Sequence, residues 1–254
     1  AELVQAIPAG GTVILNADDA RVAAMRSLAA DGVRVLTYGI GADADVRAEA
    51  LRLTSDGSQF MVTWNNERHD YSIPLAGRHN VSNALAALAA GFVLGYTPQE
   101  MQTGLQRLAV TKMRYEVHEV GAWTFINDAY NASPSSMAAA LETTANLYEG
   151  RKIAVLGDML ELGDAAEEAH RRIGRHVAEL GFAALVTYGS QSRWMDAAAA
   201  AAGCPVCRHA ETHEVAAEHL RSLLRDGDTV LFKGSRGMKM EAVIALLTGE
   251  EAGH

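Results

Sequence analysis

The sequence predicts an α/β protein made of two mostly parallel sheets with helices on their faces. Short β-branched runs alternate with alanine-rich helical stretches, a pattern typical of parallel sheets covered by helices. This pattern occurs twice along 254 residues, which predicts one domain over residues 1–110 and a second over residues 111–254. Between residues 46 and 75 apolar and polar residues alternate instead, which predicts a small antiparallel flap beside the first sheet.

The first domain is expected to open with the end of a helix and to close with two long helices. Its elements, in order, are helix 1–6, strand Thr12–Asn16, helix 21–30, strand 33–38, three antiparallel strands over 46–75, helix 80–94 and helix 98–108. Turns at residues 56–57 and 65–66 separate the antiparallel strands. Thr97 is the expected N-cap of the last helix, with Pro98 at its first position.

The second domain is expected to be a Rossmann-like sheet. Its predicted strands cover residues 116–120, 123–127, 152–156, 183–188 and 229–232, and helices follow most of them. Sheets of this kind hold ligands at the carboxyl ends of their strands. Because the fold supports many functions, the residues at those strand ends must decide between them.

The composition excludes several classes of partner. The chain carries 22 Lys+Arg against 31 Asp+Glu, a formal net charge of −9, and no basic run, so neither nucleic acid nor an anionic membrane is an expected partner. No apolar stretch reaches the roughly 18 to 20 residues of a membrane span, and no signal peptide opens the chain, so we expect a cytoplasmic protein. The chain begins at Ala1, inside what reads as the end of a helix, which predicts a cut N-terminus.

The polar turn at residues 127–134 is the most informative segment. It joins an apolar strand to an alanine-rich helix. Asp128, Tyr130 and Asn131 place a carboxylate, an aromatic face and an amide at the end of that strand, where open α/β sheets hold ligands. Turn chemistry alone explains the asparagine, serine and proline of the segment but not the pairing of Asp128 with Tyr130, so turn formation and function both stay open.

Two further segments carry groups suited to a nucleotide. Asn80 and Asn83 share one face of a predicted helix, and an amide offers a donor beside an acceptor, as the edge of adenine requires. The alternative is a helix cap with polar residues in the first turn. Arg114 lies at the joint between the domains, where its guanidinium either reaches a phosphate or is a solvated linker charge.

Two loops, at residues 156–163 and 232–237, form another candidate site. Each follows a strand and precedes a helix, so backbone N–H groups together with Lys233, Ser235 and Arg236 can collect a carboxylate or a phosphate. The alternative is that both loops are ordinary turns, in which glycine permits the backbone conformation, followed by ordinary helix caps.

The remaining Cys and His residues are expected to be structural. Cys204 and Cys207 form a C-x-x-C followed by His209, but this spacing is not typical of a zinc site, so we expect free thiols and no metal. His170 stands alone in the sequence and is expected to be structural too.

Taken together, five strings of the sequence resemble the Mur ligases of peptidoglycan synthesis. They are GRHNVSNALAA, KMRYE, INDAYNASPSSM, LGDMLELG and KGSRGMKME, and the resemblance covers essentially the whole chain. It implies an ATP-dependent amide-bond ligase. In the family, ATP phosphorylates the terminal carboxylate of UDP-N-acetylmuramoyl-tripeptide, and the amine of D-Ala-D-Ala attacks the resulting acyl phosphate. The implied cofactors are ATP and Mg²⁺, and the expected state is a monomer.

The resemblance also implies a role for individual residues. It assigns the adenine contacts to Asn80 and Asn83 and the ribose contact to Asp128. Tyr130 and Asn131 are expected in the same nucleotide pocket, and Arg114 at the phosphates. Among these, Arg114 is the expected catalytic group. The site for the incoming dipeptide is assigned to Asp158, Glu161, Lys233, Ser235 and Arg236.

The chain departs from the family pattern in one respect. Nothing in it matches G-x-x-x-x-G-K-[ST], the loop that holds the phosphates of ATP. In the family that loop, the Mg²⁺ ligands and the domain that binds the uridine nucleotide lie upstream. We therefore expect residues 1–110 to be the second half of a P-loop-type central ATPase domain, residues 111–254 to be the complete C-terminal domain, and the fragment to be inactive alone.

Two other functions remain open from the sequence. Because the phosphate loop is lacking, the alternative to a ligase is a non-catalytic module that binds a nucleotide or a peptide. Within the ligase class, the alternative is another Mur ligase, such as the one adding meso-diaminopimelate or lysine, or a folylpolyglutamate synthase. The string KGSR argues against the amino-acid-adding relative, which is expected to carry KGHE.

Overall fold

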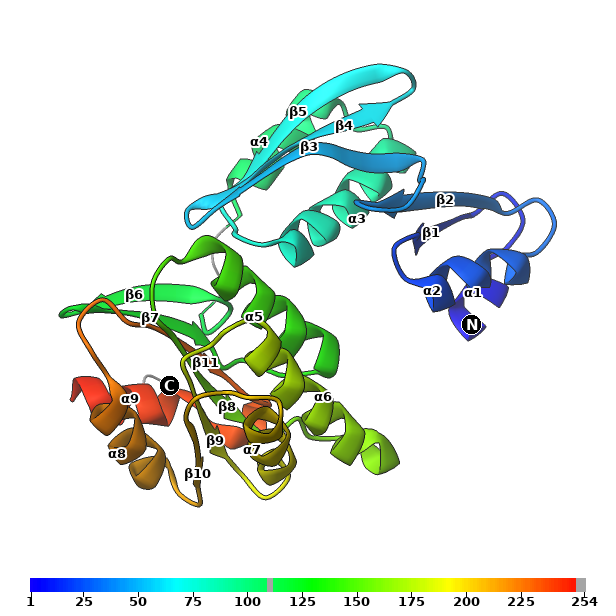
Figure 1. Ribbon diagram of the computed structural model, residues 1–254. Coiled ribbons are helices and arrows are strands. Elements are labelled where there is room, and N and C mark those ends of the chain that lie inside the picture. The colour runs from blue at the N-terminus through cyan, green and yellow to red at the C-terminus, as the bar shows by residue number, and fades with distance from the viewer. Residues whose placement is uncertain (109–111, 250–254) are drawn as a thin grey trace. The chain divides into compact units, whose positions relative to one another are not determined.

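The computed structural model describes residues 1–108 and 112–249. They form two compact units, residues 1–109 and 110–254, each with its own sheet (Figure 1). The first sheet combines parallel and antiparallel pairings, the second is mostly parallel, and both carry helices, so the predicted α/β class is confirmed. Among the helices that the structure describes, none is long and apolar enough to cross a membrane.

The strands that the structure describes in the first unit form one sheet in the order β1-β2-β3-β4-β5. Its strands are β1 (Thr12–Asn16), β2 (Arg34–Gly39), β3 (Val46–Thr54), β4 (Gly57–Trp64) and β5 (Glu67–Ile73). The antiparallel pairing of β3, β4 and β5 is as predicted. However, β3 also pairs with β2 in parallel, with Tyr38 opposite Val46, so the expected flap is a continuation of the same sheet.

Helices cover both faces of this first sheet. They are α1 (Glu2–Gln5), α2 (Ala20–Ala24), a 3₁₀ turn over Met25–Leu28, α3 (Arg78–Leu94) and α4 (Pro98–Gln106). Leu85 and Leu88 of α3 are buried against Phe60 and Val62 of β4, and this contact forms the core of the unit. Thr97 caps α4 in a capping box with Glu100, as the sequence predicts for Thr97.

The carboxylate of Asp18 ties together the turns that follow β1 and β2. It accepts hydrogen bonds from the backbone N–H groups of Ile40, Gly41 and Ala42 at 2.7, 2.9 and 2.8 Å. Burial raises the pKa of Asp18, but the three N–H donors outweigh burial and hold the pKa below its usual value. A Cβ at Gly39 would lie 3.1 Å from Oδ1 of Asp18, so a glycine there leaves room for the carboxylate.

The strands described in the second unit form a sheet in the order β10-β9-β8-β11-β7-β6. They are β6 (Glu116–Val120), β7 (Trp123–Asp128), β8 (Lys152–Gly157), β9 (Ala184–Tyr188), β10 (Cys207–Ala210) and β11 (Thr229–Lys233). Every pairing reported in this sheet is parallel except that of β6 with β7. The sequence did not predict β10, because this edge strand is only four residues long and includes Arg208 and His209.

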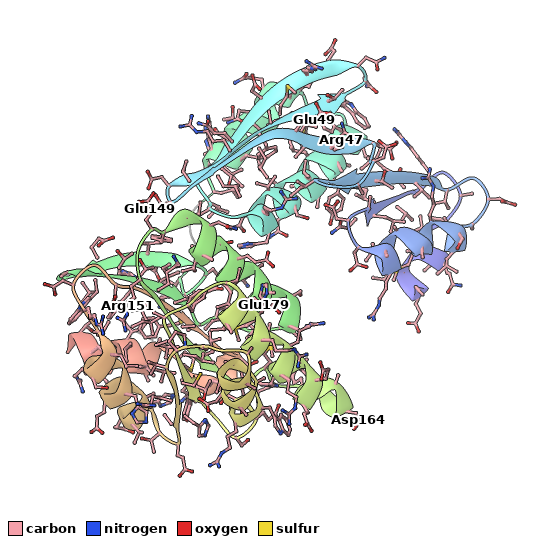
Figure 2. The ribbon with its side chains drawn as sticks, in the orientation of Figure 1. Arg47, Glu49, Glu149, Arg151, Asp164 and Glu179 are labelled. Carbon is pink, nitrogen blue, oxygen red and sulfur yellow. The ribbon has the colours of Figure 1, made fainter. Side chains whose placement is uncertain are left out.

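Five α-helices of the described segment cover the two faces of the second sheet (Figure 1). They are α5 (Pro134–Leu147), α6 (Ala166–Glu179), α7 (Ser192–Ala201), α8 (His213–Leu223) and α9 (Glu241–Thr248), with 3₁₀ turns over Gly163–Ala165 and Arg236–Met238. In the core, the rings of Phe125 and Phe232 meet edge to face with centroids 5.1 Å apart. Arg151, labelled in Figure 2, pairs with the buried Asp228 and fastens the start of β8 to the start of β11.

A close crossing of α6 and α7 depends on Gly174. A Cβ built at Gly174 would lie 2.1 Å from the carbonyl oxygen of Met195, which is backbone and has little freedom to move. We expect Gly174→Ala to lower the free energy of unfolding by about 2 kcal/mol or more, as overpacking does. Urea unfolding followed by circular dichroism measures this change.

Gly104→Ala in α4 is the matched control. No atom lies within 4 Å of a Cβ at Gly104, and alanine favours a helix over glycine by about 0.5–1 kcal/mol. This variant should therefore be as stable as the unmodified chain or more stable. A Gly174→Ala variant with unchanged stability would contradict the close packing of α6 on α7.

Candidate active site

A groove of about 560 Å³ lies at the carboxyl ends of the central strands of the second sheet. It is lined by Tyr130, Asn131, Ala132, Ser133, Leu160, Glu161, Leu162, Ser235, Arg236 and Gly237. These residues follow β7, β8 and β11. From β8 the chain runs outward to β9 and β10 and then returns to β11 on the other side of β8. The groove therefore lies where the strand order reverses. Open α/β sheets bind their ligands at such a point.

Asp128 and Lys233 form a buried ion pair beside this groove. They end the neighbouring strands β7 and β11 and are register partners. The Lys233 side chain is 3% exposed, and its Nζ lies 2.6 Å from Oδ2 of Asp128, whose side chain is 16% exposed. Nζ also donates to the carbonyl oxygen of Asn131 at 3.0 Å. The sequence placed Lys233 in the dipeptide site, but in the structure its ammonium group binds protein groups.

The segment that carries Arg114 is fixed to the end of β7. The N–H of Tyr115 donates to Oδ1 of Asp128 at 3.0 Å, and the N–H of Tyr130 donates to the carbonyl oxygen of Met113 at 3.0 Å. Met113 and Tyr115 have φ values of +59° and +55°, a conformation that non-glycine residues adopt only when their surroundings enforce it. Arg114 lies between them, with its guanidinium 4.2 Å from the centre of the Tyr130 ring.

Tyr115 anchors this segment in the core. Its side chain is buried, and its hydroxyl forms a 2.9 Å hydrogen bond with the hydroxyl of Thr144 in α5. Burial raises the pKa of Tyr115, so the phenol stays protonated at neutral pH. Arg114 is exposed and carried by a rigid support, which suits a cation that must meet a charged ligand at a fixed place.

Asp158 and Ser235 are buried and hold the loops of the groove in place. The Asp158 carboxylate accepts from the N–H groups of Gln191 and Ser192 at 3.2 and 2.6 Å, and its backbone carbonyl accepts from the N–H of Ser235. The Ser235 hydroxyl accepts from the N–H of Leu160 at 2.9 Å. The resemblance assigned both residues to the dipeptide site, but their polar atoms bond to the protein, so the structure favours a supporting role.

Arg236 and Glu161 are the charged side chains of the groove that reach solvent. Arg236 is 52% exposed and pairs with Glu241 in the first turn of α9. Glu161 is exposed and adopts a positive φ of 64°. Leu160 is 37% exposed and adds an apolar wall. A guanidinium beside leucine side chains can bind a carboxylate that carries small apolar substituents.

His170 is buried in α6 and supports the same loop. Its Nδ1 lies 2.7 Å from the carbonyl oxygen of Ala166, and its Nε2 lies 3.0 Å from the backbone nitrogen of Met159. Nδ1 therefore donates to the carbonyl oxygen, and Nε2 accepts from the N–H group of Met159. This geometry agrees with the structural role expected from the sequence.

Asn80 and Asn83 lie in the first unit, in the first turns of α3. The helix begins after Gly77, which has a φ of 97° and no side chain to cap it. Asn80 is therefore not the N-cap, and its side-chain amide donates to the carbonyl oxygen of Ala76 at 2.8 Å. Asn83 is exposed on the next turn. Arg114 and Asp128 belong to the second unit.

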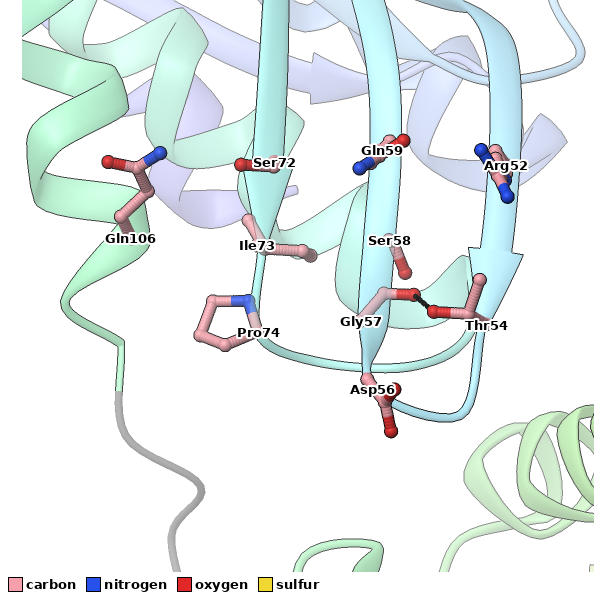
Figure 3. Close-up of a pocket in the computed structure, with 10 residues that line it drawn as sticks. All are labelled: Arg52, Thr54, Asp56, Gly57, Ser58, Gln59, Ser72, Ile73, Pro74 and Gln106. Carbon is pink, nitrogen blue, oxygen red and sulfur yellow. Dashed lines mark hydrogen bonds between the residues drawn. The ribbon is translucent and has the colours of Figure 1, made fainter.

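A second groove, of about 380 Å³, lies on the face of the first sheet formed by β3, β4 and β5 (Figure 3). Its lining residues are Arg52, Thr54, Asp56, Gly57, Ser58, Gln59, Ser72, Ile73, Pro74 and Gln106. The hydroxyl of Thr54 bonds to the carbonyl oxygen of Gly57 across the hairpin. The sequence analysis did not single out any of these residues as a candidate site.

The two cysteines lie at the start of β10 and just before it, and both are free thiols. A hydrogen bond between the thiols lowers the pKa of Cys204 to about 7 and raises that of Cys207. Within residues 1–108 and 112–249, no group of three or more His, Cys, Asp or Glu side chains could hold a metal ion.

Models of two protein domains match the chain. The Mur ligase middle domain matches residues 1–91, and the Mur ligase glutamate ligase domain matches residues 113–236. Among curated relatives, the UDP-N-acetylmuramoyl-tripeptide–D-alanyl-D-alanine ligase of Bacillus subtilis is 36% identical over 218 residues, covering 82% of this chain and 46% of that protein. The Escherichia coli ligase of the same name is 30% identical over 249 residues, covering 97% and 54%.

Solved structures give the same result. A MurF crystal structure from Acinetobacter baumannii superposes with a TM-score of 0.87 at 30% identity, covering 98% of this chain and 54% of that one. MurF from Thermotoga maritima in complex with ADP has a TM-score of 0.82 at 21% identity, covering 98% and 56%, and shares the fold. Folylpolyglutamate synthase from Mycobacterium tuberculosis with ADP also shares the fold, with a TM-score of 0.66 at 19% identity, covering 88% and 51%.

These findings confirm the resemblance drawn from the five strings. The chain spans about half the length of the curated relatives it matches. The two domain models follow each other along the chain in the order of its two units. The chain belongs to the Mur ligase family, with a middle-domain segment followed by a glutamate ligase domain.

Proposed function

We propose that this chain is part of an ATP-dependent ligase that joins D-Ala-D-Ala to UDP-N-acetylmuramoyl-tripeptide. The observation that carries the proposal is the groove of the second unit, whose lining includes the exposed Arg236 together with Tyr130 and Asn131. The names of the Bacillus subtilis and Escherichia coli relatives support this choice of substrates. The proposed domain division is residues 1–110 for the middle domain and 111–254 for the C-terminal domain.

We assign the nucleotide to the residues around Asp128. Its carboxylate accepts hydrogen bonds from ribose hydroxyls, and Tyr130 and Asn131 line the same place. The exposed guanidinium of Arg114 can bind a phosphate, so this set of residues fits the ribose and phosphates of a nucleotide. Asn80 and Asn83 are assigned to the adenine edge. ATP supplies the phosphoryl group that activates the tripeptide carboxylate, and the Mg²⁺ ligands are expected upstream of this chain.

We assign the dipeptide to the other side of the groove. Arg236 binds the dipeptide carboxylate, while Leu160 contacts its methyl groups and Glu161 lies nearby. Lys233, Ser235 and Asp158 act from beneath by holding the loops. The task of these residues is to place an amine next to an activated carboxyl group, because such reactions depend on positioning and on charge neutralisation more than on covalent protein groups.

A chimeric ligase tests the proposal directly. The upstream half of the Bacillus subtilis relative is joined to this chain, and the purified protein is given tripeptide, D-Ala-D-Ala and Mg-ATP. The expected product has the mass of tripeptide plus dipeptide minus water. A chimera that uses lysine or meso-diaminopimelate instead would identify another Mur ligase. A folded chimera that binds the substrates without making a product would favour a non-catalytic binding module.

The 254-residue chain alone should bind adenosine and ATP about equally weakly. It keeps the groups proposed for adenine and ribose but contains no G-x-x-x-x-G-K-[ST] loop, so most of the phosphate binding energy is missing. We expect dissociation constants no tighter than about 1 mM, or about 4 kcal/mol. Calorimetry with adenosine, ADP and Mg-ATP measures them. Micromolar binding of Mg-ATP would contradict this prediction by revealing phosphate-binding groups in the chain.

A further inference from the structure

Lys233 occupies an unusual place for a lysine. It is the last residue of β11, a strand that is buried along its whole length, and its own side chain is 3% exposed. Burying an ammonium group is costly unless it is paired and hydrogen-bonded. The reason for a lysine here must therefore be a contact within the protein.

The ammonium group of Lys233 has an acceptor for each of its three protons. Nζ lies 2.6 Å from Oδ2 of Asp128, 3.0 Å from the carbonyl oxygen of Asn131 and 3.5 Å from that of Asp128. A lysine has three donors and no acceptor, so none of its hydrogen-bonding capacity is left for a substrate. The contacts span both ends of the Asp128–Asn131 turn, which fixes the shape of that turn.

The Asp128–Asn131 turn also holds the segment that carries Arg114. Oδ1 of Asp128 accepts from the N–H of Tyr115, and the N–H of Tyr130 donates to Met113. Arg114 then lies over the ring of Tyr130 at 4.2 Å. A continuous set of contacts therefore runs from the buried Lys233 through the turn to the exposed guanidinium.

We propose that Lys233 is a positioning residue whose buried ammonium group fixes the Asp128 carboxylate and, through it, the Met113–Tyr115 segment. The proposal deepens the proposed function and rests on it only for the roles of Asp128 and Arg114. Lys233 contacts no substrate. It orients Asp128, with one carboxylate oxygen toward the lysine and the other toward Tyr115.

Hydrogen exchange in the full chain tests the proposal without a ligand. Lys233→Met keeps the length of the side chain but removes the charge that Oδ2 of Asp128 contacts. The amides of Tyr115 and Tyr130 should then exchange at least about tenfold faster, beyond any change at Val155 in the centre of β8, because the opening is local. Equal acceleration at all three amides would overturn the proposal in favour of a purely structural role.

A double-mutant cycle separates the ion pair from a general loss of packing. Lys233→Met should raise the equilibrium constant for unfolding roughly 100-fold, because one buried charge loses its partner. Lys233→Met combined with Asp128→Asn should recover at least about tenfold of that loss. Lys152→Met is the control, because the ammonium group of Lys152 donates to the carbonyl oxygens of Tyr148 and Gly150, and it should change the constant less than about threefold. Additive effects of the two substitutions would overturn the proposed coupling.

Nucleotide binding then links the ion pair to the site. The unmodified chain should bind ADP several-fold more tightly than 2′,3′-dideoxy-ADP, as measured by ligand-observed NMR, whereas Lys233→Met should bind both equally. Retained preference for ADP in Lys233→Met would overturn the positioning role. A lack of preference in the unmodified chain would instead contradict the ribose role of Asp128 in the proposed function, while the exchange experiment still decides the role of Lys233.

Discussion

Replacing Arg114 by alanine in the chimeric ligase should lower kcat about 100-fold and change the KM for the tripeptide much less. A fixed cation that faces a transferring phosphoryl group acts mainly in the transition state, and losing one such group typically costs about 100- to 1,000-fold in kcat. The structure supports this role because two residues with positive φ and a buried tyrosine hold the exposed guanidinium in place. Steady-state kinetics with varied tripeptide separate the two constants.

Two further variants make this result specific. Arg114→Lys keeps the charge but loses the planar group that stacks on Tyr130, so its kcat should be intermediate. Lys112→Ala removes an exposed cation two residues away and should leave kcat nearly unchanged. If Arg114→Ala keeps the kcat of the unmodified chimera, the assignment of Arg114 to the phosphates is wrong.

Arg236→Ala should raise the KM for D-Ala-D-Ala about tenfold and leave the KM for ATP nearly unchanged. A hydrogen bond to a charged group contributes about 1.5–3 kcal/mol, and the lower end applies because the Arg236 side chain is 52% exposed. Arg236 lines the groove, whereas the ammonium group of Lys233 beneath it is fully bonded to the protein. We therefore expect binding of the dipeptide carboxylate to depend on one accessible cation among the described residues of the groove.

Initial rates at varied dipeptide and at varied ATP measure the two constants in one preparation. Arg172→Ala is the control, because Arg172 is an exposed cation on α6 that does not line the groove. Equal increases in both KM values for Arg236→Ala would point to a disturbed loop, since Arg236 also pairs with Glu241.

The strands of the second sheet were predictable from the sequence because most are buried on both faces. Ile153 and Val155 in β8 and Val230 and Phe232 in β11 belong to continuous apolar runs. These runs have the length of a buried strand and are too short for a typical helix. The edge strand β10 has no such run and was missed. In the first unit the antiparallel strands were predicted, but their parallel link to β2 was not, because two paired residues leave no pattern in the sequence.

The sequence predicted which residues belong to the candidate site better than it predicted how their side chains are arranged. Residue types and strand ends singled out Tyr130 and Arg236, as members of two separate candidate sites, and in the structure both line one groove. The burial of Lys233 was not foreseen, because the sequence does not tell where the end of a long side chain lies. The contact of Arg114 with Tyr130 depends on positive φ values at non-glycine residues, which composition and periodicity do not reveal.

We propose that the groove of the second unit accepts D-Ala-D-Ala on one side and the nucleotide on the other, at Tyr130 and Asn131. The most direct measurement is an NMR titration of the 254-residue chain with D-Ala-D-Ala and, separately, with ADP. D-Ala-D-Ala should shift the amides of Leu160, Glu161 and Gly237, L-Ala-L-Ala should bind more weakly, and ADP should shift the amides of Tyr130 and Asn131. Shifts at Leu160 and Gly237 that are equal for both dipeptide stereoisomers, or absent at saturating D-Ala-D-Ala, would contradict the account.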